Sequence, residues 1–152
     1  MIANKKTKTM ILIFVLIAIL LISLIWFWPH KTERKNVFLN NQTFNVVIAK
    51  TVKTHMQGLM YKKELAENEG MLFFFPISAK HSFWMKNTYI PLDIIWFNDQ
   101  KEVVYIEKNC QPCKTLICKS YIPQAPAKYV LELNANMSDK INLKVGDKIS
   151  WE

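Results

Sequence analysis

The chain has 152 residues, of which 51% are hydrophobic, so it is long enough for one domain with a buried core and too short for two. Its net charge of +8 would suit an anionic partner, but residues 1–35 alone contain six basic residues against one acidic residue. The rest of the chain is only weakly basic, so the charge gives little support to nucleic-acid binding and we expect no nucleic-acid partner.

An apolar run at residues 10–28 follows a short basic tail at residues 1–9. The run contains no charged residue, only Ser23 is polar, and aromatic residues close it at 26–28. A helix of this length spans about 28 Å, close to the roughly 30 Å of a bilayer core. We therefore predict a single-pass transmembrane anchor, with the following domain on the extracytoplasmic side. Export followed by cleavage of this segment as a signal peptide is the alternative.

A polar linker at residues 29–36 leads into a domain that we place at residues 37–152. Residues 37–39 and 43–49 are rich in β-branched and aromatic side chains, and the Asn40-Asn41 pair between them predicts a hairpin turn. Apolar residues at spacings of three and four then predict a short amphipathic helix over residues 51–60 with Thr51 as its N-cap.

The rest of the domain has a strand-like pattern. Five consecutive apolar residues at 71–75, bounded by Pro76, predict a strand buried on both faces. Further strands are predicted at 83–87, 92–97, 103–106, 129–133 and 148–151, with a helical turn at 137–141. The expected fold is mainly β: a small β-sandwich or barrel-like domain of roughly eight short strands with one or two short helices, and not a βαβ sheet.

Five segments occur in an order and spacing that resemble a known family. They are "GLM" at 58–60, "EGMLFFF" at 69–75, "FWMKNTYIPLDIIWF" at 83–97, "PAKYVLEL" at 126–133 and "VGDKI" at 145–149. The chain is similar over about residues 37–152 to the uncharacterised family called domain of unknown function 192. The resemblance implies a small, mainly β, commonly exported domain and implies no reaction. Where the family often has arginines before "GLM", this chain has His55 and Gln57.

The three cysteines are Cys110, Cys113 and Cys118. A structural zinc site normally has four ligands, and the sequence of this loop offers no fourth Cys or His, so we expect no metal and no cofactor. A structural disulfide is favoured outside the cytoplasm, and a metal site or a redox-active thiol remain as alternatives. The family resemblance implies that Cys113 pairs with Cys118, which leaves Cys110 unpaired.

Polar residues within the longest segment are the candidate site. Lys86, Asn87 and Asp93 lie among large apolar residues, where such side chains need partners. One interpretation is structural: Asn87 caps a turn at 88–91, and Lys86 pairs with Asp93. The other is a ligand site, with Trp84 and Met60 at the edge of a groove. Lys86, Asp93 and His81 are weak catalytic candidates. A Ser/His nucleophilic pair of Ser82 with His81 is disfavoured, because adjacent strand residues point to opposite faces.

The leading hypothesis is a membrane-anchored extracytoplasmic domain that binds an envelope component: a polysaccharide, a peptide or a protein. Its basis is the apolar N-terminal run, the β pattern and the lack of a recognisable catalytic motif in the sequence. One alternative is an enzyme that acts on an envelope substrate through a Lys/Asp site. Another is a purely structural assembly partner of a membrane protein.

Overall fold

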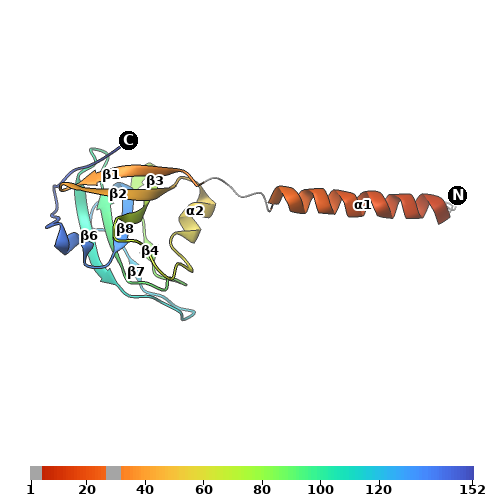
Figure 1. Cartoon of the computed structure of the whole chain (residues 1–152). Coiled ribbons are helices and arrows are strands. Elements are labelled where there is room, and N and C mark those ends of the chain that lie inside the picture. The colour runs from red at the N-terminus through yellow and green to blue at the C-terminus, as the bar shows by residue number, and fades with distance from the viewer. Residues whose placement is uncertain (1–4, 27–31) are drawn as a thin grey trace. The chain divides into compact units, whose positions relative to one another are not determined.

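Figure 1 shows the computed structural model of the chain, which describes residues 5–26 and 32–152. The chain divides into two units between Lys31 and Thr32. Parts of the predicted tail, anchor and linker, at residues 1–4 and 27–31, lie outside the described residues.

The N-terminal unit contains one helix, α1 (Lys5–Trp26). The predicted apolar helix therefore forms, but it begins five residues earlier, within the basic tail, so that Lys5, Lys6 and Lys8 belong to it. Within the two described ranges, no helix meets the length and hydropathy required to cross a membrane. The transmembrane helix predicted at residues 10–28 is thus not found.

A curled seven-stranded sheet forms the C-terminal unit (Figure 1). Its strands follow the order β6-β5-β8-β3-β2-β1-β9, and β4 pairs with β7 in a separate two-stranded sheet. The strands are β1 (Arg34–Leu39), β2 (Gln42–Ala49), β3 (Glu69–Ala79), β4 (Phe83–Trp84), β5 (Leu92–Phe97), β6 (Val103–Cys110), β7 (Ser120–Tyr121), β8 (Ala127–Asn134) and β9 (Ile149–Trp151). The short helices are α2 (Val52–Gln57) and α3 (Met137–Lys140).

The sheet curls until its two edge strands approach each other. Glu102 and Lys148, which precede edge strands β6 and β9, form an antiparallel bridge. Beside it, the Val103 amide donates to the Asp147 carbonyl at 2.8 Å. The barrel-like form of the prediction is therefore confirmed in its coarse outline: a mainly β, curled half-barrel with few short helices.

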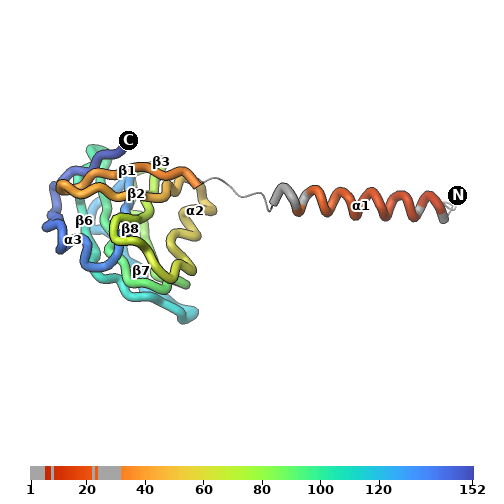
Figure 2. Tube along the Cα trace, viewed as in Figure 1, coloured from red at the N-terminus to blue at the C-terminus, as the bar shows by residue number. Residues whose placement is uncertain are grey.

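One connection differs from the expectation of a sheet without βαβ units. β2 and β3 pair in parallel, and the chain between them passes through α2, as Figure 2 traces. Two parallel strands cannot be joined by a tight turn, so the crossover needs a segment of a dozen or more residues. This crossover places α2 against one face of the sheet, which matters for the site described below.

Both faces of the central strands are buried. All six residues of β5 are buried, and its five apolar residues divide between two clusters. The inner core lies inside the curl and includes Leu72, Ile95, Phe97, Leu131 and Leu133. The outer core lies on the opposite face, beneath α2 and β4, and includes Met71, Phe73, Phe83, Ile94, Trp96 and Val130. The prediction that residues 71–75 are buried on two faces is confirmed for Met71, Leu72 and Phe73.

Two local predictions from turn and cap chemistry are confirmed. Asn40 and Asn41 both have positive φ, at 45° and 62°, as a two-residue hairpin turn between β1 and β2 requires. Thr51 caps α2 with a reciprocal pair of bonds, since its hydroxyl accepts from the Thr54 amide and its own amide donates to the Thr54 hydroxyl. The helix ends at Gln57 and not at residue 60, because Gly58 leaves helical geometry with φ 47°.

Asp93 fastens three segments of the fold. Its side chain is fully buried and accepts three backbone hydrogen bonds, from Asn109 and Ser138 at 2.8 Å and from Asn136 at 3.1 Å. It therefore fixes the bulge in β6 and the start of α3. The predicted Lys86–Asp93 pair is wrong: the Lys86 ammonium instead donates to the Leu116 carbonyl at 3.3 Å.

The hydrogen bonds of Asp93 predict a large loss of stability for Asp93→Asn. In asparagine an amino group replaces one of the two carboxylate oxygens. A backbone amide that donates to that oxygen in the wild type would then face another donor and lose its hydrogen bond. We expect the free energy of unfolding to fall by about 3 kcal/mol, measured by urea titration. Asp99→Asn is the control, because Asp99 is an exposed partner of Lys128 and should change stability by less than about 1 kcal/mol. Equal effects of the two substitutions would contradict the fastening role.

Candidate functional site

The polar residues singled out from the sequence do not gather at one place. Asp93 points to the inner core side and is used by three backbone amides. Asn87, with φ 55°, donates from its side chain to the Tyr61 hydroxyl at 3.0 Å, and its carbonyl accepts from the Tyr61 amide at 2.8 Å. Lys86 forms an isolated bridge to Cys113. Lys86 and Asp93 therefore do not form the predicted acid–base pair.

His81 also has a structural setting. Its ring stacks on Phe75 with centroids 3.6 Å apart, and its Nε2 donates to the Ile77 carbonyl at 2.9 Å. The His81 carbonyl in turn accepts from the Trp96 indole at 2.9 Å, which satisfies the only donor of a tryptophan side chain buried in the outer core. These contacts hold the segment before β4 against the sheet.

A different acidic residue, Glu132, faces a pocket. Glu132 lies on β8 opposite Ile94 and Met71, so its side chain enters the outer core between two neighbouring strands. It is 4% exposed, and its Oε2 has no hydrogen-bond partner among the described residues. Burial raises the pKa of this carboxyl from 4.5 to about 8. Glu132 is therefore mainly a neutral acid at pH 7, able to donate and to accept hydrogen bonds.

The sequence reasoning missed Glu132 for a specific reason. In "YVLEL" the glutamate alternates with apolar residues, which is the pattern of a polar side chain on the solvent face of a strand. Only the cover formed by the α2 segment and β4 buries that face. The available signal was the run at 92–97, in which every residue except Asp93 is apolar and which pairs with β8.

A small pocket leads to Glu132 from the surface. Its volume is about 20 Å³, which is room for about one water-sized group. The lining residues are His55, Met56, Gln57, Gly58, Leu59, Met60, Phe73, Phe83, Trp84, Thr88 and Glu132. The walls are mixed: apolar side chains such as Phe73 and Phe83 line the pocket together with the polar residues His55, Gln57 and Thr88, and Glu132 is the acidic residue among them.

Gly58 gives the pocket its access to the carboxyl. The residue ends α2 with φ 47°, a conformation that side chains with a Cβ rarely adopt. A Cβ on Gly58 would lie 3.7 Å from Glu132 Oε2 and 3.6 Å from the Phe73 ring. The bare backbone at this position therefore keeps the buried carboxyl free of a covering side chain.

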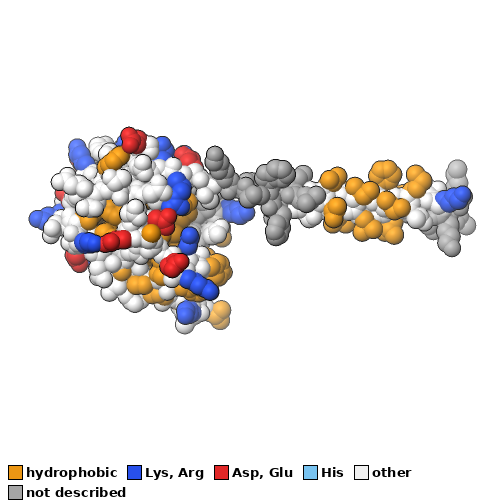
Figure 3. Space-filling view, in the orientation of Figure 1, with side chains coloured by type: hydrophobic (Ala, Val, Ile, Leu, Met, Phe, Trp, Pro, Cys, Tyr) orange, Lys and Arg blue, Asp and Glu red, His pale blue; other side chains and the backbone are white. Residues whose placement is uncertain are grey.

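An apolar groove adjoins the mouth of this pocket. It has a volume of about 660 Å³ and is lined by Val52, Lys53, Met56, Gln57, Met60 and Trp84. Val52 is 76% exposed, Met56 64% and Trp84 47%, which is high for large apolar side chains. Figure 3 shows hydrophobic side chains on the lower right of the domain surface, with lysine or arginine side chains beside them.

The groove and the pocket share Met56, Gln57, Met60 and Trp84. Trp84 and Met60, two of the ligand-contact candidates from the sequence, thus line both. Lys86, Asn87 and Asp93 line neither.

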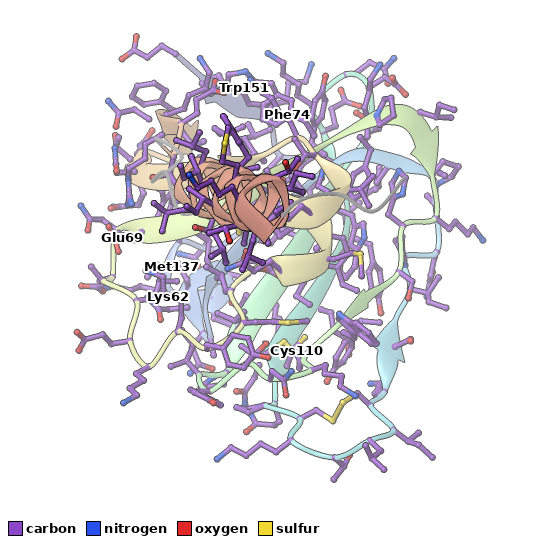
Figure 4. The ribbon with its side chains drawn as sticks, turned by 90° about the vertical axis from the view of Figure 1, so that its right-hand side faces the viewer. Lys62, Glu69, Phe74, Cys110, Met137 and Trp151 are labelled. Carbon is purple, nitrogen blue, oxygen red and sulfur yellow. A yellow bond between two sulfur atoms is a disulfide. The ribbon has the colours of Figure 1, made fainter. Side chains whose placement is uncertain are left out.

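The cysteines form one disulfide and one buried thiol. Cys113 and Cys118 are bonded, as the family resemblance implied. Cys110 is buried, and desolvation raises the pKa of its thiol to about 12, which makes it a poor nucleophile. Figure 4 shows the disulfide in a loop at the lower edge of the domain, apart from Cys110. In the described parts of the chain, no three His, Cys, Asp or Glu residues are placed to hold a metal ion together.

Comparison with known proteins finds relatives across nearly the whole C-terminal unit. A UPF0127 protein of Thermococcus sibiricus is 30% identical over 115 residues, which cover 72% of this chain and 68% of that protein. A UPF0127 protein of Pyrococcus horikoshii is 28% identical over 124 residues, covering 78% and 95%.

Solved structures share the fold. A protein of unknown function from Novosphingobium aromaticivorans matches with a TM-score of 0.71 and 31% identity, over 79% of this chain and 85% of that one. A Sinorhizobium meliloti protein, whose suggested role is that of a transcription regulator, matches with a TM-score of 0.72 and 30% identity, over 81% and 97%. The family model described as "Uncharacterized ACR, COG1430" matches residues 35–151, and the chain therefore belongs to the DUF192 family.

Proposed function

We propose that this domain is an extracytoplasmic binding module that holds a peptide segment of another envelope protein. The observation that carries the proposal is the Glu132 carboxyl, buried without a partner for Oε2 at the end of a pocket that opens into an exposed apolar groove. A peptide would place apolar side chains in the groove and one slim polar group against Glu132.

The energetic position of Glu132 supports a ligand role. A buried polar atom without a partner costs about 1–3 kcal/mol, and a leucine or methionine at this place would avoid that cost. Groups that a fold leaves unsatisfied are typical of sites where stability is sacrificed for function. A ligand that hydrogen-bonds to Oε2 would remove the cost upon binding.

The lining residues favour a peptide over a polysaccharide. A sugar chain presents many hydroxyl groups that need hydrogen-bond partners, whereas the groove offers Val52, Met56, Met60 and Trp84 beside Lys53 and Gln57. Methionine side chains adapt their shape to varied apolar partners, and Trp adds a large, rigid contact surface. The pocket admits only about one water-sized group, so the polar tip of the ligand must be narrow.

The raised pKa of Glu132 supports one second candidate, an enzyme that uses this residue as a general acid or base. A carboxyl that titrates near pH 8 can exchange a proton at neutral pH. Glu132→Gln separates the two functions, because glutamine can still donate and accept hydrogen bonds but cannot transfer a proton. Retained function in this variant supports the binding module, and retained binding with lost turnover supports the enzyme.

The extracytoplasmic location is part of the proposal. The Cys113–Cys118 disulfide supports it, since such bonds persist mainly in oxidising compartments. We propose that the apolar N-terminal helix acts as the export segment, whether it is later cleaved or retained.

Glu132 predicts a distinct pH dependence of stability. Because its pKa is about 8 in the folded chain and ordinarily 4.5, the native state holds a proton that the unfolded state releases between these values. The free energy of unfolding should therefore fall as the pH rises from 4.5 to 8 and level off above 8. Glu132→Gln should remove this contribution and gain about 5 kcal/mol over the wild type above pH 8. Exposed Glu64→Gln is the control, and equal pH profiles of wild type and Glu132→Gln would contradict the buried acid.

Photocrosslinking tests the ligand class. A benzophenone amino acid at Met56, in the groove, should capture a peptide in intact cells, whereas the same residue at Val145, which is similarly exposed, should not. A synthetic copy of the captured segment should bind the purified protein, with about tenfold weaker affinity for Trp84→Ala or Glu132→Leu. A captured glycan, or a peptide whose affinity these variants leave unchanged, would overturn the proposal.

Thiol counting tests the compartment. In protein from acid-quenched cells, denatured without reduction, alkylation should modify Cys110 alone, and after reduction it should modify all three cysteines. A reporter enzyme that is active only outside the cytoplasm, fused after Glu152, should be active. Three free thiols before reduction, with an inactive reporter, would place the domain in the cytoplasm.

A further inference from the structure

The loop closed by the disulfide carries the two most exposed large apolar side chains among the described residues. Leu116 is 91% exposed and Ile117 is 90% exposed, and they are adjacent at the tip of the loop Cys113–Cys118. We call this segment the stapled loop. Figure 4 shows its disulfide near the lower edge of the domain, where the loop projects away from the sheet.

Hydrogen bonds hold the stapled loop in this exposed form. The Thr115 hydroxyl donates to the Ile117 carbonyl at 2.7 Å. Outside the loop, Lys86 donates to the Leu116 carbonyl at 3.3 Å, and the Lys86 backbone bridges to Cys113. The disulfide closes the ring behind the tip. Both apolar side chains are therefore presented to solvent by a pre-ordered backbone, which lowers the entropic cost of their later burial.

Lysines surround the apolar tip. Lys114 and Lys119 flank it in the sequence, and Lys86 lies at its base. The Lys114 ammonium lies 5.6 Å from the centroid of the Tyr89 ring, and the Lys119 ammonium lies 4.4 Å from that of Tyr121. Among the described residues, Glu107 pairs with one of these lysines, 3.4 Å from Lys119, so the charge around the tip stays positive.

We propose that the stapled loop is a membrane-contact site that inserts Leu116 and Ile117 into the interfacial layer of an anionic lipid surface. The lysines would then lie at the level of the phosphate groups, where long basic side chains extend from an apolar stem to a polar head. Each lysine near an anionic membrane adds electrostatic attraction, which salt screens within about 10 Å of the surface.

A convex tip fits a lipid surface better than it fits a protein groove of its own size. Two aliphatic side chains bury little area, far less than a stable protein interface requires. The lysines complement the phosphate layer of a bilayer, and the apolar side chains at the tip complement the acyl layer beneath it. This inference does not depend on the peptide ligand of the groove, because no residue of the stapled loop lines the Glu132 pocket.

The site also has a geometric consequence for the groove. Trp84 of β4 pairs with Ser120 of β7, directly after the stapled loop, so loop and groove belong to adjoining segments. A domain that contacts the lipid through Leu116 and Ile117 would hold the groove near the membrane surface.

The test uses the full chain reconstituted into vesicles, so that any lipid binding by α1 is the same in every sample. An environment-sensitive fluorescent amino acid replaces Ile117, or Val145 as the control, and lipids with a quencher at a known depth report insertion. In phosphatidylcholine vesicles that contain phosphatidylglycerol we expect quenching at position 117 and none at 145. The double substitution Lys114→Gln and Lys119→Gln should lower the ratio of membrane-inserted tip to free tip roughly tenfold.

Three results would overturn the proposal. Absence of quenching at position 117 would show that the tip does not enter lipid. Equal quenching in pure phosphatidylcholine, unaffected by the lysine substitutions, would remove the anionic surface as the ligand. Shielding of the label in native membranes but not in lipid vesicles would assign the tip to a protein partner. Near-ultraviolet circular dichroism of each variant checks that the domain is folded.

Discussion

Burial of the β5–β8–β3 part of the sheet on both faces is the constraint on which the rest of the structure depends. A polar side chain in the buried middle of these strands has no access to water through either face, so it must find a partner or remain unsatisfied. Asp93 on β5 and Glu132 on β8 are the two carboxyls in this position. They are one residue out of register, since Asp93 pairs with Leu133 and Ile94 pairs with Glu132, and therefore they enter opposite cores.

The two carboxyls differ in their hydrogen bonding. Asp93 is surrounded by backbone amides from β6 and the start of α3, which is the environment that stabilises a buried carboxylate. Glu132 receives no such donors for Oε2, and burial alone raises its pKa. Its position is fixed by close backbone packing: a Cβ on Gly70 of β3 would approach the Glu132 carbonyl to 2.5 Å. The fold thus holds Glu132 firmly while leaving its acid group unsatisfied.

Local chemistry could be read from the sequence, and long-range burial could not. The Asn40-Asn41 turn and the Thr51 cap depend on neighbouring residues only, and both were predicted. The parallel pairing of β2 with β3 and the role of Glu132 depend on segments distant in the chain that come together over one face. Asp93 was recognised as exceptional from its apolar surroundings, but its partners are backbone amides, which every sequence contains and no side-chain pattern reveals.

The disulfide connects the groove to the remainder of the domain. The outer face of Glu132 is covered partly by Phe83 and Trp84, which form the two-residue strand β4. Such a short strand, paired only with β7, has little stability of its own. Cys113 bridges to Lys86, two residues after β4, and Cys118 lies two residues before β7, so the bond between the cysteines restrains the segments next to both strands. The mouth of the Glu132 pocket is therefore held in part by a disulfide, whose presence depends on the redox state of the surroundings. Reduction would loosen β4 and β7 before it disturbed the seven-stranded sheet.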